Sequence, residues 1–283
     1  MIKEWIGEYK PQNTDQAKAA LREIMQEVAL AGLQRSGFFE KAAFYGGTAL
    51  RIFHGLDRFS EDLDFSLLHA DPDFSFEPHF ESIITEFGAI GMKVSIKEKK
   101  KTNQTNIDSA FLKSETVWKE LILDSIIPQA GIGTAVNIKI KLEVDREPPS
   151  GFETEEKLLL RPFSFYVKCF TLPNLFAGKL HALLFRKWGN RVKGRDWYDF
   201  EWYVKKGIPL NLQHFLLRAQ DSGDWKEATI TKSQVDQLIN DRIDAVSMEA
   251  IKEDIRRFIP DDSVLDIWSP HYFHRLVDKL RFE

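Results

Sequence analysis

Apolar and polar positions alternate with two different periods along the first half of the chain. Between residues 14 and 36 apolar side chains return every three or four positions, which predicts a long helix that Thr14 or Asp15 can cap. Shorter segments follow: we expect helices over residues 48–55 and 76–90, and strands over residues 42–47, 62–68, 92–100, 107–113 and 135–145. In the last of these strands apolar residues occupy every second position, so the residues between them, Glu143 included, share a polar face.

The pattern changes near residue 150, where Pro148, Pro149 and Gly151 interrupt it. After "TLPNLFAGKL" helical spacing continues almost to the end, with helices expected over residues 174–188, 195–206, 211–220, 231–244, 247–258 and 271–281. Strands with a few helices therefore precede a helical part. This order predicts an α+β fold, with an α+β domain over residues 1–160 and a mainly helical domain over residues 161–283.

The composition excludes several classes of protein. A net charge of −4 gives no general attraction to nucleic acid, so any such attraction needs a local basic patch. Cys169 is the one cysteine, which excludes an intrachain disulfide and a cysteine zinc cluster. The N-terminus lacks the apolar core of a signal peptide, and no apolar run reaches the roughly 18 residues of a membrane span. We expect a soluble, cytoplasmic protein without a membrane partner.

The stretch "GGTALRIFHGLDRFSEDLDFSLL", residues 46–68, holds the first candidate site. Asp62 and Asp64 lie on the expected strand at positions that project from the same face. Two carboxylates this close repel each other, and Mg²⁺, which prefers oxygen ligands, compensates their charge well. Glu143 is the candidate for a third carboxylate, and Asp145 on the same strand face is the alternative.

A glycine pair precedes these carboxylates. Gly46 and Gly47 open the expected helix and leave backbone N–H groups free to hold phosphate, to which Thr48 can add a hydroxyl donor. Taken alone, the pair is better explained as a tight turn between strand and helix. Followed by the carboxylate pair, it suits a nucleoside triphosphate with its metal. No Walker A motif occurs, which excludes a P-loop enzyme.

A basic segment forms the second candidate site. Lys179 and Arg186 are seven positions apart and are expected to share a helix face. Basic residues then crowd the loop without an intervening acid: Arg186, Lys187, Arg191, Lys193 and Arg195. Lys179 can neutralise triphosphate charge, and the loop can hold the phosphates of a nucleotide or an RNA backbone. Asp196 and Asp199 follow at the start of the next helix, where acids also suit the helix dipole.

Four segments taken in this order resemble the AbiEii/AbiGii family of nucleotidyltransferase toxins, within the polymerase-β-like nucleotidyltransferase superfamily. They are "GGTALR", "RFSEDLDFSL", "IKLEVDREP" and "KLHALLFRKWGNRVKGRDWYDF". The resemblance covers residues 15–205 and is weaker in the helical tail. It implies a polymerase-β-like mixed sheet with helices, followed by a helical region. It also implies the toxin of a type IV toxin–antitoxin or abortive-infection system, with an antitoxin as partner.

The resemblance assigns roles to individual residues. It makes Asp62, Asp64 and Glu143 the metal ligands, with Glu143 standing where an aspartate is commoner. Lys179 corresponds to the family lysine, and Asp196 to the acid of the last motif, with Asp199 as the alternative. The residues it places near nucleotide or phosphate are Gly46, Gly47, Thr48, Arg58, Ser60, Lys179, Arg186, Arg191 and Arg195. Gly47 departs from the serine often found at its position, and Arg58 and Ser60 are also expected to position the turn before Asp62.

The implied reaction is nucleotidyl transfer. One or two Mg²⁺ ions orient the triphosphate, the acceptor hydroxyl attacks the α-phosphorus and pyrophosphate leaves. The basic segment favours a macromolecular acceptor, tRNA or protein. One alternative is an enzyme that modifies a small molecule such as an antibiotic. Another is an inactive scaffold that binds antitoxin or RNA, against which the intact pair Asp62 and Asp64 argues.

Overall fold

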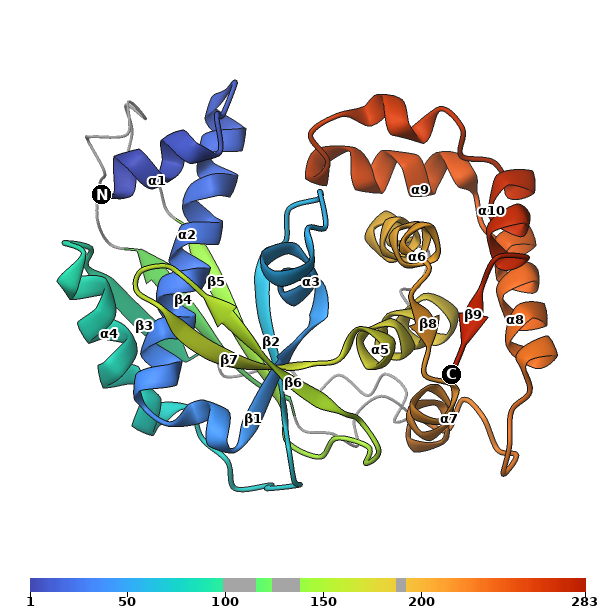
Figure 1. The fold of residues 1–283 in the computed structure, drawn as a ribbon, viewed down its shortest axis with the longest axis horizontal. Coiled ribbons are helices and arrows are strands. Elements are labelled where there is room, and N and C mark those ends of the chain that lie inside the picture. The colour runs from blue at the N-terminus through green and yellow to red at the C-terminus, as the bar shows by residue number, and fades with distance from the viewer. Residues whose placement is uncertain (99–115, 124–137, 187–191) are drawn as a thin grey trace. The chain divides into compact units, whose positions relative to one another are not determined.

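The structure is a computed structural model that describes residues 1–98, 116–123, 138–186 and 192–283. Contacts within the chain divide it into two compact units (Figure 1). The first contains Met1–Gly55, Phe59–Pro148 and Thr154–Cys169. The second contains Leu56–Arg58, Pro149–Glu153 and Phe170–Glu283.

A mixed sheet of seven strands forms the centre of the first unit, in the order β3-β4-β5-β2-β1-β7-β6. The strands are β1 (Ala42–Tyr45), β2 (Asp62–Leu67), β3 (Val94–Glu98), β4 (Thr116–Leu123), β5 (Lys139–Asp145), β6 (Thr154–Leu159) and β7 (Phe165–Phe170). β2 runs antiparallel to β1 and parallel to β5, so it lies in the middle of the sheet. This strand carries the two aspartates.

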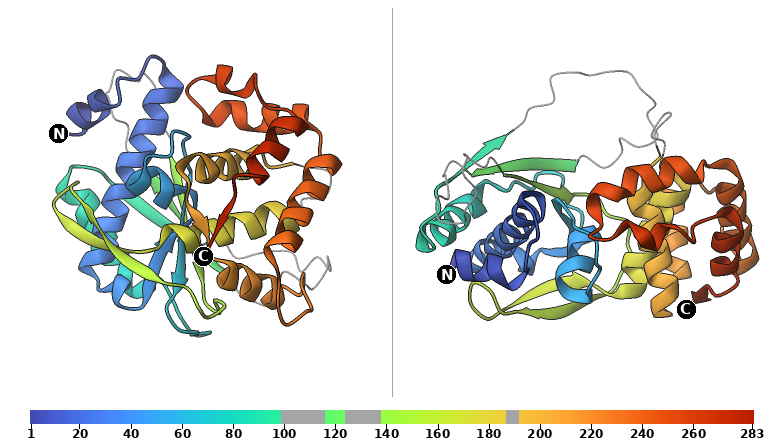
Figure 2. Two further views of the ribbon diagram at one scale, coloured as in Figure 1. Left: turned by 45° about the vertical axis from the view of Figure 1, so that its right-hand side comes forward. Right: turned by 90° about the horizontal axis from the view of Figure 1, so that it is seen from above.

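Helices complete the first unit: α1 (Ile2–Glu8), α2 (Thr14–Arg35), α3 (Gly46–His54) and α4 (Phe80–Ala89), with 3₁₀ turns at Phe38–Glu40 and Glu77–His79. Asn13, and not Thr14 or Asp15, caps α2 by accepting a hydrogen bond from the backbone N–H of Gln16. α2 and α4 pack side by side, and α2 also contacts β5 (Figure 2). Their apolar faces are buried in one core with the sheet.

Aromatic side chains hold β2 in this core. The ring of Phe65 meets that of Phe38 edge to face at 4.8 Å, and it also contacts Phe44 and Phe76. Leu63 and Phe65 are fully buried, whereas Asp62 and Asp64, which alternate with them, are half-buried. Burying one phenylalanine contributes about 1.5–3 kcal/mol, and a shift of one residue in register would turn both apolar side chains outward. The core therefore determines which way the aspartates face.

The second unit is mainly helical. Its helices are α5 (Leu172–Phe185), α6 (Gly194–Lys206), α7 (Leu212–Asp221), α8 (Lys232–Ala245), α9 (Met248–Ile255) and α10 (Pro270–Val277), with 3₁₀ turns at Arg256–Phe258 and Asp262–Leu265. Side-chain caps begin α7, α8, α9 and α10 at Asn211, Thr231, Ser247 and Ser269. A two-stranded parallel sheet pairs β8 (Pro209–Leu210) with β9 (Arg281–Phe282).

The α+β fold predicted from the pattern is confirmed, with differences in several elements. α1, β4, β6, β7 and the short strands β8 and β9 were not expected. β6 mixes charged and apolar residues without a clean alternation. The helix predicted over residues 174–188 ends at Phe185, and Arg186 follows in an extended conformation. Arg186 therefore does not continue the helix face of Lys179, as the sequence had suggested. The strand predicted over residues 107–113 lies outside the described residues, as does Arg191.

Two features bear on the excluded classes. Cys169, a free cysteine, is buried in β7, and burial raises the pKa of its thiol far above the usual value. Among the helices that the structure describes, none combines the length and the apolar character needed to cross a bilayer.

Candidate active site

The two aspartates stand at the beginning of β2, on the face opposite Leu63 and Phe65. The hydroxyl of Thr48, a fully buried residue of α3, donates a hydrogen bond to the backbone carbonyl of Asp62. This bond ties the start of α3 to the start of β2. The hydroxyl of Thr48, which was expected from the sequence to donate to phosphate, donates to this carbonyl instead.

The carboxylate of Asp64 lies against Gly46, at the start of α3. The φ of Gly46 is +87°, in the left-handed region that favours glycine. A Cβ atom built on it would lie 2.4 Å from Oδ2 of Asp64, a distance that real Cβ atoms essentially never show. The turn from β1 into α3 therefore needs a residue without a side chain at position 46. Gly47, which is also buried, follows inside the helix.

Glu143 faces the same side of the sheet, because it stands in register with Asp64 on the neighbouring parallel strand. Its Oε1 lies 2.5 Å from Nζ of Lys141, which is itself in register with Asp62. Asp145 stands opposite Ser66, two pairs farther along, and accepts a hydrogen bond from the backbone N–H of Glu147. In-register pairing thus favours Glu143 over Asp145 as the neighbour of Asp64.

The donor set at this place fits a hard divalent cation, since half-buried carboxylates on one strand face supply the oxygens that Mg²⁺ prefers. The side chains do not converge into a closed metal site. Across the described parts of the chain, no group of three or more His, Cys, Asp or Glu residues is arranged to hold an ion. Within the described structure, Asp62 and Asp64 share one strand face, and Glu143 beside them is engaged with Lys141.

A buried charge cluster lies in the second unit. Nε and Nη2 of Arg58 each lie 2.6 Å from a different carboxylate oxygen of Asp199, and Nζ of Lys179 lies 2.8 Å from Oδ2. Arg58 is 1% exposed, and Asp199 is fully buried. Burial would raise the pKa of Asp199, but the two cations outweigh burial and hold that pKa below its usual value. The guanidinium that the sequence had placed near phosphate is thus bound to Asp199.

Arg195 and Lys193 lie at the start of α6. The guanidinium of Arg195 stacks 4.3 Å above the ring of Phe258, and Asp196 is buried in the first turn. Lys193 occupies the N-cap position of α6 without a side-chain cap, and burial together with the charges of Arg186, Arg195 and Lys179 lowers its pKa to about 8. The charge of Asp196 opposes this shift in part. The sequence places Lys193 in the basic loop without distinguishing it from its neighbours, because the order of residues does not show which side chain is partly shielded from solvent.

Ser60 precedes the aspartates in the first unit. Its backbone carbonyl accepts a hydrogen bond of 3.2 Å from Nε2 of Gln26 on α2. The sequence contained no sign of this contact, since Gln26 lies within an apolar helix pattern 34 residues upstream. The expected positioning of this turn thus involves the backbone of Ser60.

Known proteins share this fold over nearly the whole chain. The structure of JHP933 from Helicobacter pylori aligns with a TM-score of 0.51 at 17% identity, covering 92% of this chain and 88% of that one. MenT4, a nucleotidyltransferase toxin of Mycobacterium tuberculosis, aligns with a TM-score of 0.52 at 14% identity, covering 99% of both chains. A search of curated proteins found no match.

The sequence itself matches a family model, described as the nucleotidyl transferase AbiEii toxin of type IV toxin–antitoxin systems. The match extends over residues 28–278 and so includes both aspartates of β2 and the charge cluster of the second unit. The chain therefore belongs to the AbiEii family of nucleotidyltransferase toxins.

Proposed function

We propose that this nucleotidyltransferase moves a nucleoside monophosphate from a nucleoside triphosphate onto a tRNA or protein acceptor, with Mg²⁺ bound at Asp62 and Asp64. The observation that carries the proposal is the strand face of β2. Both aspartates project from it, and the carboxylate of Asp64 fills the space that a side chain at Gly46 would need. A carboxylate pair beside the start of a helix brings a metal ligand and phosphate-binding N–H groups together.

Each candidate site residue of the first unit has its own role in the proposed reaction. Mg²⁺, when bound, would neutralise phosphate charge. Asp62 and Asp64 would hold it, and the backbone N–H groups at Gly46 and Gly47 would donate to phosphate oxygens and orient the triphosphate for in-line attack at the α-phosphorus. Glu143 either adds an oxygen ligand or accepts the proton of the acceptor hydroxyl. The new bond joins that oxygen to the α-phosphorus, and pyrophosphate leaves with the electrons of the broken bond.

The second unit supplies positive charge. Arg58 and Lys179 share the carboxylate of Asp199, and the charge of Asp196 also acts on Arg58. The positive charge in excess therefore comes from Lys193 and from Arg186 and Arg195, whose charges act on Lys193, which suits the phosphates of a nucleotide or of an RNA backbone. This concentration of cations supports a polyanionic acceptor such as tRNA. As a member of a type IV toxin–antitoxin family, the chain is also expected to have a cognate antitoxin that counteracts it.

Labelling tests the proposal. Purified protein is incubated with Mg²⁺, total tRNA, cell protein and each of the four labelled nucleoside triphosphates in turn. We expect transfer of label to one acceptor, and loss of that transfer in Asp64→Asn. Asp73→Asn, which changes an exposed aspartate of the same unit, is the matched control and keeps the activity. Wild-type protein that labels no acceptor with any nucleotide would overturn the proposal.

A further inference from the structure

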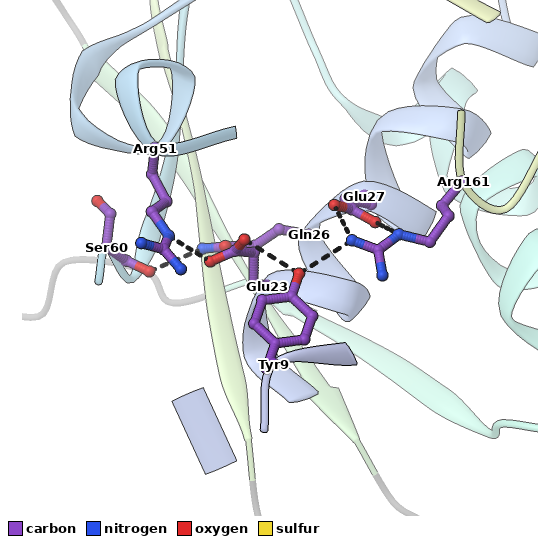
Figure 3. A network of polar contacts seen from close by, with 7 residues as sticks. All are labelled: Tyr9, Glu23, Gln26, Glu27, Arg51, Ser60 and Arg161. Carbon is purple, nitrogen blue, oxygen red and sulfur yellow. Dashed lines mark hydrogen bonds and ion pairs between the residues drawn. The ribbon is translucent and has the colours of Figure 1, made fainter. Parts of the chain in front are cut away.

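A polar network joins α2 to the segments around the candidate site, all within the first unit (Figure 3). α2 contributes Glu23, Gln26 and Glu27, which are 8%, 1% and 4% exposed. Burying polar side chains costs free energy unless each one finds partners, so an apolar residue would serve better for packing alone. The three side chains face specific partners, which calls for another explanation.

Gln26 contacts the segment that leads into β2. Its amide donates to the carbonyl of Ser60, two residues before Asp62. Arg22, on the same helix, forms an ion pair of 3.4 Å with Glu61, which directly precedes Asp62. Neighbouring positions of α2 thus hold successive residues of the segment that leads into the aspartates.

Glu23 acts on α3, the helix that begins with the glycine pair. Its Oε2 accepts a hydrogen bond of 2.8 Å from Nε of Arg51 on α3. Thr48, on the same helix, donates to the carbonyl of Asp62. The contacts therefore close a ring from α2 to α3, from α3 to β2, and from the residues before β2 back to α2.

The rest of the network holds Glu23 and α2 in place. Tyr9 donates from its hydroxyl to Oε1 of Glu23 at 3.0 Å, and Arg161 donates to the hydroxyl oxygen of Tyr9 at 3.1 Å. Arg161 also lies 2.8 Å from Oε2 of Glu27. Each carboxylate of the network thus has a cationic partner, and the side chains lie in defined directions (Figure 3).

We propose that Gln26 is a positioning residue for nucleotidyl transfer, which fixes the entry to β2 and thereby the placement of Asp62 and Asp64 for a divalent cation. Arg51, through its hydrogen bond to Glu23, fixes the position of α3 and thereby the turn at Gly46. This inference rests on the proposed function, because it assigns the metal to those aspartates. Gln26 touches neither substrate nor metal; it acts through the backbone of Ser60.

The test compares Gln26→Met, which keeps the length of the side chain and removes the donor, with Gln34→Met on the same helix. Gln34 makes no side-chain hydrogen bond within the described structure. Gln26→Met should raise the Mg²⁺ concentration for half-maximal labelling about tenfold and lower kcat about tenfold, since misplaced groups of this kind cost up to roughly a hundredfold. KM for the acceptor should change less than about twofold, because Gln26 does not contact the acceptor and the substitution leaves ground-state binding of the acceptor unchanged. Gln34→Met should match wild type.

Binding of Mn²⁺, measured directly by paramagnetic resonance, gives a readout that does not depend on turnover. Weaker Mn²⁺ binding in Gln26→Met, with thermal unfolding still cooperative, supports the inference. Wild-type labelling with unchanged metal dependence in Gln26→Met overturns it. Wild-type protein that neither labels nor binds Mn²⁺ overturns the proposed function instead. If Gln26→Met fails to fold, Arg51→Met carries the test and should show the same rise in Mg²⁺ requirement.

Discussion

Arg58 and Asp199 form a two-point ion pair in the interior of the second unit, although 141 residues separate them in the sequence. Each carboxylate oxygen accepts one hydrogen bond from the guanidinium, and solvent reaches neither side chain to any extent. Two parallel bonds of this kind restrict both distance and angle. Lys179 shares the same carboxylate, so Asp199 sets the place of two cations at once.

Asp199→Asn should destabilise the protein strongly, because it leaves the charge of Arg58 buried without its counter-ion. Removing one partner of a buried pair costs about 3–5 kcal/mol, and urea unfolding measures the loss. Lys179→Met is the comparison, since Arg58 and Asp199 keep each other and the loss should be smaller. Equal losses of unfolding free energy in both variants would contradict the prediction that the ion pair of Arg58 with Asp199 contributes more than that of Lys179.

Gly46→Ala and Gly55→Ala separate backbone strain from the contact with Asp64. Both glycines have a positive φ, +87° and +72°, and only at Gly46 would a Cβ atom meet the carboxylate of Asp64. Alanine in the left-handed region costs about 1–2 kcal/mol at either position. Labelling should persist in Gly55→Ala and fall at least about a hundredfold in Gly46→Ala, because the carboxylate is displaced. Similar labelling by the two variants would contradict this role of Gly46.

Glu143→Gln and Asp145→Asn decide which acid of β5 takes part in the reaction. Glu143 stands opposite Asp64, whereas Asp145 stands opposite Ser66 and accepts a hydrogen bond from the N–H of Glu147. We expect labelling to fall about a hundredfold in Glu143→Gln, in line with the loss of a group that stabilises developing charge. Asp145→Asn should stay close to wild type. The reverse order of effects would assign the third carboxylate to Asp145.

Arg161→Met should destabilise the protein more at alkaline than at acidic pH. Burial raises the pKa of Glu27 to about 7, against the opposing charge of Arg161. An acid whose pKa is raised in the folded state loses stability as pH rises from its unfolded pKa through its folded one. Without Arg161 the folded pKa rises further, so the loss extends above pH 7.

The difference between wild type and Arg161→Met in urea unfolding should therefore grow by about 2 kcal/mol between roughly pH 5.5 and pH 8.5. Arg256→Met serves as control, because Arg256 pairs with Glu253 at an exposed position and its small effect should not change over this range. A constant difference for Arg161→Met would mean that Glu27 stays ionised throughout.

The parts of the fold predicted from the sequence are those in which burial follows a simple period. Leu63 and Phe65 alternate with Asp62 and Asp64, and the core enforces that alternation. α2 was predicted for the same reason, over nearly the observed range. β6 was missed because it lies at the edge of the sheet, where Leu158 is 50% exposed and charged residues are tolerated.

The candidate site divides in the same way. The face shared by Asp62, Asp64 and Glu143 follows from strand period and register, and the roles proposed for these residues remain predictions. The contacts of Arg58 and Gln26 did not follow, because each joins positions far apart in the sequence and leaves no local pattern. Nor could composition show that the hydroxyl of Thr48 is engaged by the backbone of Asp62.

The second unit is not formed by one continuous segment of the chain. It takes Leu56–Arg58 and Pro149–Glu153 from earlier in the chain, and Phe152 stacks on Phe170 with ring centroids 4.2 Å apart. A fragment that begins at residue 161 would keep Asp199 and Lys179 but lose Arg58. Chimeras between members of the family would therefore have to exchange positions 58 and 199 together, whatever boundary is chosen for the swap.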